Sequence, residues 1–557
     1  MPESVNNETF KHNLPCSGAA QATALEGPQV VRVMGSIPAL RLSRNPGLSV
    51  LALLVVFYLA YQTAELILQG DTGTLTMVGI FIVGCTIIVA ILNDWRRGLY
   101  LLFGWVMFED LFRKYLGNNM AIFFGKDVLA IVLYLAFFAA KRKNLVKSFR
   151  PPFLVPLLVF FWFGFLQMFN PASTSIFFGI LGMRLYFLYI PLMYVGYSLM
   201  ESEQDLHKFF SFNCVLFLVV AGLGIAQAIL GHTFLNPRIL QEDIRDLSTL
   251  YRAAPISGAV AYRPNSVFVS HGRFANFLTV SWLVTLGFAG YLLLRSRRSR
   301  NLAFLTMGVI AIGSIMSASR SVFLYIVANG LVLAAAFLWG APWKQGEVRR
   351  VLRTIQRTIL VVGLALLAML TLFPEELTSR FLIYSETLSP NSPASELAFR
   401  SGDYPLRNLM LAFEHPLWPY GYGIGTCSLG VQYVARVFHV PLMEIGVENG
   451  YGQLLIELGI LGLFLWIFLS AAISLSVWRT ARSLRGTPWF PLGSAISWYS
   501  FLLLVPMSYY TFVAYQDYLM NLYFWLLLGI LYRLPAISEE ALELQGAPQL
   551  ASEPGQA

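Results

Sequence analysis

Two long stretches of the sequence, 231–273 and 374–448, use arginine as their only basic residue, and neither contains a lysine. The guanidinium group presents a rigid fork of donors that matches phosphate and carboxylate oxygens, and it stays charged near neutral pH. As a set, these arginines indicate segments that hold a diphosphate. Taken singly, each is explained more simply by an ion pair with a nearby acidic residue. The set consists of Arg238, Arg245, Arg252, Arg263, Arg273, Arg380, Arg400, Arg407 and Arg436.

Two further arginines lie within or beside apolar runs. Arg184 stands about a third of the way along the run 176–199, where a charge costs on the order of 2.5–3.5 kcal/mol on membrane-insertion scales. Arg320 stands in a tight turn between two runs, and its serine and alanine neighbours leave room for a ligand. We interpret both as residues that face a water-filled cavity or an anion. The alternatives are an intramembrane ion pair for Arg184 and an interfacial anchor for Arg320.

A carboxylate and an amide, those of Glu448 and Asn449, stand where the stretch 374–448 meets a long apolar run. Asn is a good N-cap, so a helix is predicted to begin here. The positive end of a helix dipole lowers the pKa of a nearby carboxyl group, whereas burial raises that pKa. Glu448 is therefore a candidate general base for an acceptor hydroxyl group. The alternative is that Glu448 only caps the helix or forms an ion pair.

These residues must be positioned by a membrane-embedded framework. Apolar residues make up 57% of the 557 and charged residues only 12%, whereas soluble domains carry about 25% charged residues. The apolar runs are about 20 residues long, which is the length of a helix that crosses the bilayer core. The net charge of +9 does not indicate nucleic-acid binding, because the basic residues are concentrated in short loops between runs. The four cysteines show no spacing typical of disulfides or of a metal site.

The hydropathy pattern predicts an all-α fold, a polytopic transmembrane helical bundle of about 12–14 spans. Three of the runs, 98–112, 302–317 and 518–533, are short enough to be tilted or re-entrant. The candidate spans are 48–68, 75–92, 98–112, 121–140, 153–169, 176–199, 209–230, 274–294, 302–317, 321–339, 358–373, 449–477, 489–513 and 518–533.

The distribution of lysine and arginine among the short loops predicts the orientation of the chain. With the N-terminus in the cytoplasm, both termini and all of the short basic loops fall on the cytoplasmic side. Residues 1–46 and 536–557 are then disordered cytoplasmic tails of a transmembrane domain at 47–535, and the stretches 231–273 and 374–448 lie on the opposite face. The basic clusters are 96–97, 141–150, 295–300, 344–357 and 479–485.

Four segments resemble, in this order, the bacterial O-antigen ligase and polymerase superfamily, which includes Wzy-type polysaccharide polymerases and lipopolysaccharide ligases. Their order, and the long stretch before the last of them, make the combination specific, and the resemblance covers about 176–477. The segments are GMRLYFLYIPLMYVG at 182–196, RPNSVFVSHGRFANFL at 263–278, SASRSVFLYI at 317–326, and GYGIGT at 421–426 leading to VENGYGQLLIELGILG at 447–462.

The resemblance implies a metal-independent glycosyltransferase of the bacterial inner membrane that needs no cofactor. Such an enzyme transfers a glycan from undecaprenyl diphosphate to a sugar hydroxyl group at the periplasmic face, in O-antigen or exopolysaccharide biosynthesis. It also implies that Arg184, Arg263, Arg273 and Arg320 bind the donor diphosphate, and that a single displacement inverts the anomeric configuration. No Asp-x-Asp metal signature occurs in either long stretch, so no metal site is expected.

The aromatic, proline and glycine content of the stretch 374–448 predicts a folded, turn-rich lid, and in the mechanism that the resemblance implies this lid covers the site. We expect it to contact the glycan through Trp418, Tyr420 and Tyr422, with Asn449 beside them. The expected partners are an undecaprenyl diphosphate-linked oligosaccharide, the lipid bilayer, a chain-length regulator and other polysaccharide assembly proteins, and no nucleic acid.

The sequence departs from the ligases of the superfamily at the proposed base. Those ligases carry a His-Asn pair at the start of the late span, whereas this chain has Glu448 before Asn449. A carboxylate can accept the same proton, and the departure favours a polymerase over a ligase.

Two other classes of function stay open on the sequence. A transporter or lipid-linked glycan flippase would share the spans and the intramembrane charges, although no inverted repeat is evident and the outer stretches are large for a pore. A non-enzymatic assembly subunit of an envelope complex is the third reading.

Overall fold

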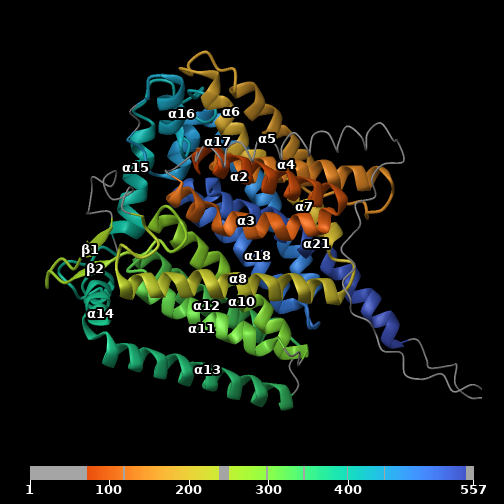
Figure 1. Cartoon of the computed structure of the whole chain (residues 1–557), viewed down its shortest axis with the longest axis vertical. Coiled ribbons are helices and arrows are strands. Elements are labelled where there is room, and N and C mark those ends of the chain that lie inside the picture. Colours follow the sequence, from red (N-terminus) through yellow and green to blue (C-terminus); the bar gives the residue numbers. More distant parts are fainter. Residues whose placement is uncertain are drawn as a thin grey trace, which may run out of the picture. The chain divides into compact units, whose positions relative to one another are not determined.

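The chain folds into membrane-spanning helices. The structure, a computed structural model, describes residues 72–116, 120–237, 250–295, 299–342, 345–397, 399–443 and 446–546, which are mostly helical (Figure 1). Within these ranges eight helices are long and apolar enough to cross a membrane. A ninth span results if the bent pair formed by Leu360–Leu372 and Pro374–Leu388 is counted as one. The protein is therefore a polytopic helical membrane protein.

The elements from α3 onward belong to one compact unit, Val83–Ala557. Before the first long stretch lie α2 (Thr72–Asn93), α3 (Trp95–Tyr115), α4 (Met120–Arg142), α5 (Leu154–Gln167), α6 (Ile176–Phe187), α7 (Leu192–Leu199) and α8 (Glu203–Leu230). Next come β1 (Tyr251–Ala253), β2 (Val260–Tyr262), α10 (His271–Arg295), α11 (Arg300–Met316), α12 (Arg320–Gly340) and α13 (Gln345–Leu372). The second long stretch contains α14 (Pro374–Leu388), η2 (Phe399–Asp403), α15 (Tyr404–Ala412) and α16 (Val431–Phe438). The chain ends with α17 (Gly450–Ser483), α18 (Phe490–Leu502), η3 (Leu503–Met507), α19 (Ser508–Tyr510), α20 (Val513–Gln516) and α21 (Tyr518–Gly546).

Every predicted span within the described ranges falls on a helix, but fewer of these helices cross a membrane than the 12–14 expected. The helices α5 and α11 have 14 and 17 residues, which is short of the roughly 20 that a bilayer requires. The helix α3 ends in four buried charged residues, Glu109, Asp110, Arg113 and Lys114, so it is too polar for a lipid-facing span. The predicted span 48–68 and the predicted tail 1–46 lie outside the described residues.

The first part of the predicted C-terminal tail is helical. The helix α21 continues through Pro535 to Gly546, so residues 536–546 are helical rather than disordered. Arg533 stabilises this extension, because its guanidinium donates to the Met200 carbonyl oxygen (3.0 Å) and to Glu540 (2.9 Å).

The helices α10, α18 and α21 form the centre of the bundle. Of the most apolar part of each span, 83%, 78% and 83% of the residues are buried. The helix α12 is only 28% buried over the same length, so its apolar side chains are available to lipid. Most side chains of α10 and α21 are therefore shielded from lipid by the surrounding helices.

The helix α17 is broken at Gly459, whose φ of +72° favours glycine. The break frees the carbonyl groups of Ile456 and Glu457 from the helical pattern. They accept hydrogen bonds from the N–H groups of Tyr422 (2.7 Å) and Gly423 (3.0 Å). The glycine-rich segment that leads to α16 is thereby fixed against a membrane helix.

The two long stretches contact each other. Glu386, near the end of α14, accepts hydrogen bonds from the N–H groups of Ile256 (2.7 Å) and Ser257 (3.1 Å) in the antiparallel β1–β2 hairpin. Arg380 donates to the Tyr262 carbonyl oxygen at 3.1 Å. Figure 1 shows β1 and β2 beside α14. The second stretch is folded, as predicted from its composition, and it holds the hairpin of the first.

Candidate functional site

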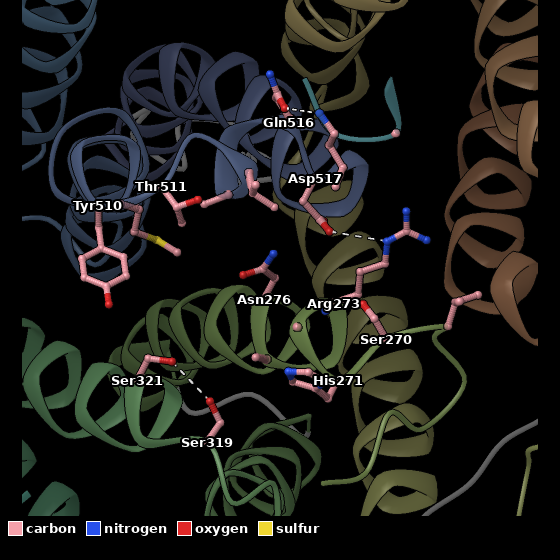
Figure 2. A pocket seen from close by; sticks show the side chains of 18 of the residues that line it. Ser270, His271, Arg273, Asn276, Ser319, Ser321, Tyr510, Thr511, Gln516 and Asp517 are labelled. Atoms are coloured by element: carbon pink, nitrogen blue, oxygen red, sulfur yellow. Dashed lines mark hydrogen bonds and ion pairs between the residues drawn. The ribbon is translucent and has the colours of Figure 1, made fainter. Parts of the chain in front are cut away.

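A cavity of about 1000 Å³ lies in the compact unit, and Figure 2 shows part of its lining. Its walls come from α4, α6, α10, α12 and α16, from the β1–β2 region, and from the η3-to-α21 segment. Both long stretches therefore contribute to one cavity, together with helices that are far apart in the sequence.

Arginine is the main charged residue of this cavity. Among the described residues seven arginines line it, and they include all four that the resemblance assigns to a diphosphate. Two carboxylates, those of Glu396 and Asp517, are also in the lining. The arginines are Arg113, Arg184, Arg252, Arg263, Arg273, Arg320 and Arg400.

Three of the seven, Arg113, Arg184 and Arg273, face aspartates and are called the paired arginines here. The Arg184 Nε lies 2.7 Å from Asp127. The Arg273 Nη1 lies 2.7 Å from Asp110, and Arg113 lies 3.7 Å from the same carboxylate. Arg184 therefore forms an ion pair within the membrane, which was the alternative interpretation from the sequence. It also lines the cavity.

The other four, Arg252, Arg263, Arg320 and Arg400, are called the clustered arginines. Glu396 accepts hydrogen bonds from Arg320 (2.8 Å) and Arg400 (3.2 Å), and these bonds lower the pKa of Glu396. Burial and the positive charges of Arg252 and Arg320 lower the pKa of Arg263 to about 10. Burial, followed by the charge of Arg320, lowers the pKa of Arg252. Mutual repulsion of this kind favours a bound anion at this end of the cavity.

Neutral polar groups complete the lining. Figure 2 shows His271 and Asn276 on α10 across the cavity from Tyr510 and Thr511. Ser319 lies at the start of α12, and its hydroxyl group is 3.2 Å from the Ser321 hydroxyl group. Hydroxyl, amide and imidazole groups can each exchange hydrogen bonds with sugar hydroxyl groups.

Part of the cavity wall is apolar, and two of its apolar side chains are exposed. Phe124 on α4 is 42% exposed and Leu324 on α12 is 38% exposed, and both line the cavity. Leu181 and Leu185 on α6 continue this wall. The arrangement can hold a ligand that has both an anionic part and a hydrocarbon part.

Glu448 is not among the residues that line the cavity. Its carboxylate is exposed and accepts a hydrogen bond from the Tyr404 hydroxyl group, which raises the pKa of Tyr404. The Arg400 guanidinium lies over the Tyr404 ring, 4.7 Å from its centroid, and Arg400 does line the cavity. Glu448 is thus connected to the edge of the cavity through two side chains.

Asn449 caps α17, as predicted from its position. Its side-chain oxygen accepts the Gly452 N–H at 2.9 Å, and its amide group donates to the Pro405 carbonyl oxygen at 3.0 Å. Asn449 is 1% exposed. Its amide is therefore engaged within the protein, and a glycan contact by this side chain is not supported.

The three aromatic residues expected to contact a glycan do not line the cavity. Tyr422 is buried and packs with Trp418 in a small apolar cluster beside the start of α17. Tyr420 is 76% exposed. The structure places all three at the segment that fixes the break in α17.

Several residues that line the cavity were not predicted as site residues from the sequence. Arg252 and Arg400 belong to the arginine set of the long stretches, but nothing in their spacing distinguished them from Arg407, which is exposed and does not line the cavity. Arg113 and its partner Asp110 could have been found by the cluster of charges that interrupts an apolar run. His271 and Asp517 carried no such signal.

No protein-family model matches the chain, and no curated protein matches it in sequence. Within the described ranges, no three histidine, cysteine, aspartate or glutamate residues are grouped closely enough to hold a metal ion. The resemblance to the O-antigen ligase and polymerase superfamily therefore stays a prediction.

Proposed function

We propose that the protein is a glycosyltransferase of the bacterial inner membrane, with both termini in the cytoplasm. It transfers a glycan from an undecaprenyl diphosphate-linked donor to a sugar hydroxyl group at the periplasmic face, in O-antigen or exopolysaccharide biosynthesis. A polymerase is favoured over a ligase. The resemblance is the starting point, and the observation that carries the proposal is the arginine-lined cavity.

The cavity supports the proposal because its lining contains all four arginines that the resemblance assigns to the donor diphosphate. Arg263 and Arg320 belong to the clustered arginines, and Glu396 of the same lining pairs with Arg320 at 2.8 Å. A diphosphate placed there would receive charge-assisted hydrogen bonds from rigid guanidinium forks. The other two predicted diphosphate ligands, Arg184 and Arg273, pair with aspartates.

The apolar wall supports a lipid-linked donor rather than a free sugar nucleotide. An undecaprenyl chain needs a route from the diphosphate site into the bilayer. Phe124 and Leu324, which are both exposed and both in the lining, provide apolar borders for such a route.

In the proposed reaction an acceptor hydroxyl oxygen attacks the anomeric carbon of the donor. The bond between that carbon and the phosphate oxygen breaks, and undecaprenyl diphosphate leaves with the electron pair. The clustered arginines stabilise the charge that develops on this leaving group. Glu448 accepts the hydroxyl proton from an acceptor that enters at the edge formed by Arg400 and Tyr404.

The test uses the full-length protein in detergent with an undecaprenyl diphosphate-linked repeat unit. The proposal predicts lengthened lipid-linked glycan and release of undecaprenyl diphosphate. Arg320→Ala is expected to lower kcat/KM by about a hundredfold or more, since it removes leaving-group stabilisation. Arg407→Ala is the matched control, because Arg407 is exposed and lies outside the cavity lining.

Glu448→Gln tests the general base separately. We expect kcat to fall by about 10²–10⁴ while the donor KM changes little. Full activity in Glu448→Gln would exclude Glu448 as the base and leave the arginine site unaffected.

A lipid-linked glycan flippase is the second candidate, because the same cavity could hold a lipid diphosphate during transport. Reconstituted vesicles distinguish the two functions. Translocation of the lipid without any chain growth would favour the flippase, whereas neither activity would favour a non-enzymatic assembly subunit.

A further inference from the structure

Asp110 connects three segments from behind the cavity wall. This residue of α3 is fully buried and is not itself in the cavity lining. Its carboxylate accepts hydrogen bonds from Arg273 on α10 (2.7 and 3.0 Å), from the Val269 N–H (3.2 Å), and from the Tyr518 hydroxyl group on α21 (3.4 Å). Arg273, Val269 and Tyr518 all line the cavity.

Two of the three nitrogens of the Arg273 guanidinium face carboxylates. Its Nη1 lies against Asp110, and its Nε is 3.9 Å from Asp517, as the dashed line in Figure 2 indicates. A phosphate at Arg273 would have to compete with these two fixed negative charges at close range. At the clustered arginines, Glu396 contacts Arg320 at 2.8 Å and Arg400 at 3.2 Å, so one negative charge of the lining is shared among four positive charges.

We propose that Asp110 is a positioning residue that withholds Arg273 from the bound anion and fixes the cavity wall from Val269 to Arg273. The anion is then directed to the clustered arginines. The inference rests on the proposed function in one respect, which is that the bound anion is a lipid-linked diphosphate.

Asp110→Asn, compared with wild type, tests the inference without any transfer activity. Inorganic diphosphate is titrated against the purified full-length proteins in detergent. Because Asp110→Asn removes the negative charge beside Arg273, we expect the affinity for diphosphate to rise by about three- to tenfold, as one charge-assisted contact becomes available. An unchanged or lower affinity in the folded variant would overturn the proposal.

Glu109→Gln is the matched control. Glu109 is the neighbouring residue on α3 and is also fully buried, but its partner at 2.8 Å is Lys126, which is buried and does not line the cavity. This variant also loses a buried ion pair, so it reproduces the general destabilisation. Its diphosphate affinity should match that of the wild type, and a rise equal to that of Asp110→Asn would contradict the specific role of Asp110.

A second pair of variants keeps the test decisive if Asp110→Asn does not fold. Arg273→Gln should leave the affinity for diphosphate within about twofold of the wild type, because Arg273 is withheld from the anion. Arg263→Gln should lower that affinity by about tenfold or more. Equal losses in both variants would show that Arg273 binds the anion and would overturn the proposal.

Kinetics with the lipid-linked donor separate positioning from folding. Asp110→Asn should lower the donor KM several-fold and lower kcat by about tenfold or more, because the freed Arg273 holds the donor in a displaced position. Loss of folded protein cannot lower KM. If the wild type transfers no glycan, the proposed function fails, while the diphosphate titration still decides the role of Asp110.

Discussion

Glu396 is the carboxylate that partly neutralises the clustered arginines. Its carboxylate lies between Arg320 and Arg400, and the hydrogen bonds from both lower its pKa below the ordinary value of 4.5. A carboxyl group with a lowered pKa in the folded state stabilises the protein in its ionised form. Because Glu396 is 40% exposed, solvent screening limits this stabilisation to less than about 1 kcal/mol.

The pH dependence of this contribution has a definite sign. The stabilisation by Glu396 is complete above pH 4.5, the ordinary pKa, and is lost as the pH falls through the lower pKa of the folded state. Thermal unfolding of wild type and Glu396→Gln should therefore differ at neutral pH, with the wild type more stable, and the difference should vanish in acid. Glu414→Gln, at an exposed position, is the control. A wild-type advantage that persists unchanged at pH 3 would contradict this account.

At the scale of elements, the segment before α16 is held by close backbone contacts as well as by side-chain hydrogen bonds, such as that from the Cys427 N–H to Glu457. A Cβ atom on Gly425, whose φ is +89°, would lie 1.9 Å from the Phe178 carbonyl oxygen of α6. The same segment supplies the N–H groups that satisfy the break in α17. Because α16 contributes to the cavity wall, these contacts also determine the shape of the cavity.

Gly425→Ala is expected to destabilise the protein by more than about 1 kcal/mol, since both the positive φ and the contact with α6 oppose a side chain. Gly222→Ala on α8 is the matched control, because a Cβ atom there meets no atom within 4 Å. That substitution should be neutral or stabilise the helix by up to about 1 kcal/mol. Thermal unfolding in detergent measures both, and equal stability of the two variants would refute the close-contact argument.

At the scale of the whole molecule, the two long stretches meet each other and line one cavity, so they share one side of the membrane. The hydrogen bonds from the β1–β2 hairpin to Glu386 and the hydrogen bond from Arg380 to the Tyr262 carbonyl oxygen require this arrangement. Which side it is follows only from the positive-inside rule, which predicts the periplasmic face.

Single-cysteine variants in a background without the four native cysteines test this topology. Ala253→Cys in β1 and Asn391→Cys after α14 are both exposed positions on the long stretches. A membrane-impermeant thiol reagent should label both in intact spheroplasts. Lys143→Cys, on a short basic loop, should be labelled only after the membrane is opened. Labelling of one long stretch without the other would contradict the shared cavity.

The sequence by itself determined what depends on local composition and spacing. Hydropathy placed each predicted span within the described ranges on a helix, because burial in lipid requires long apolar runs. Asn449 was identified as the cap of α17, and the arginine-only stretches contain four of the seven arginines that line the cavity in the described part of the chain. These features depend on a residue and its near neighbours, so they can be read along the chain.

Only the tertiary structure decided which arginines have carboxylate partners. Arg184 pairs with Asp127, Arg273 with Asp110 and Arg320 with Glu396, and each of these partners lies far away in the sequence. Glu448 likewise stands at a predicted helix start, but the packing of α15 places it against Tyr404, outside the cavity lining. The physical reason is that an ion pair or a cavity depends on how distant helices pack, and no local pattern in the sequence records that packing.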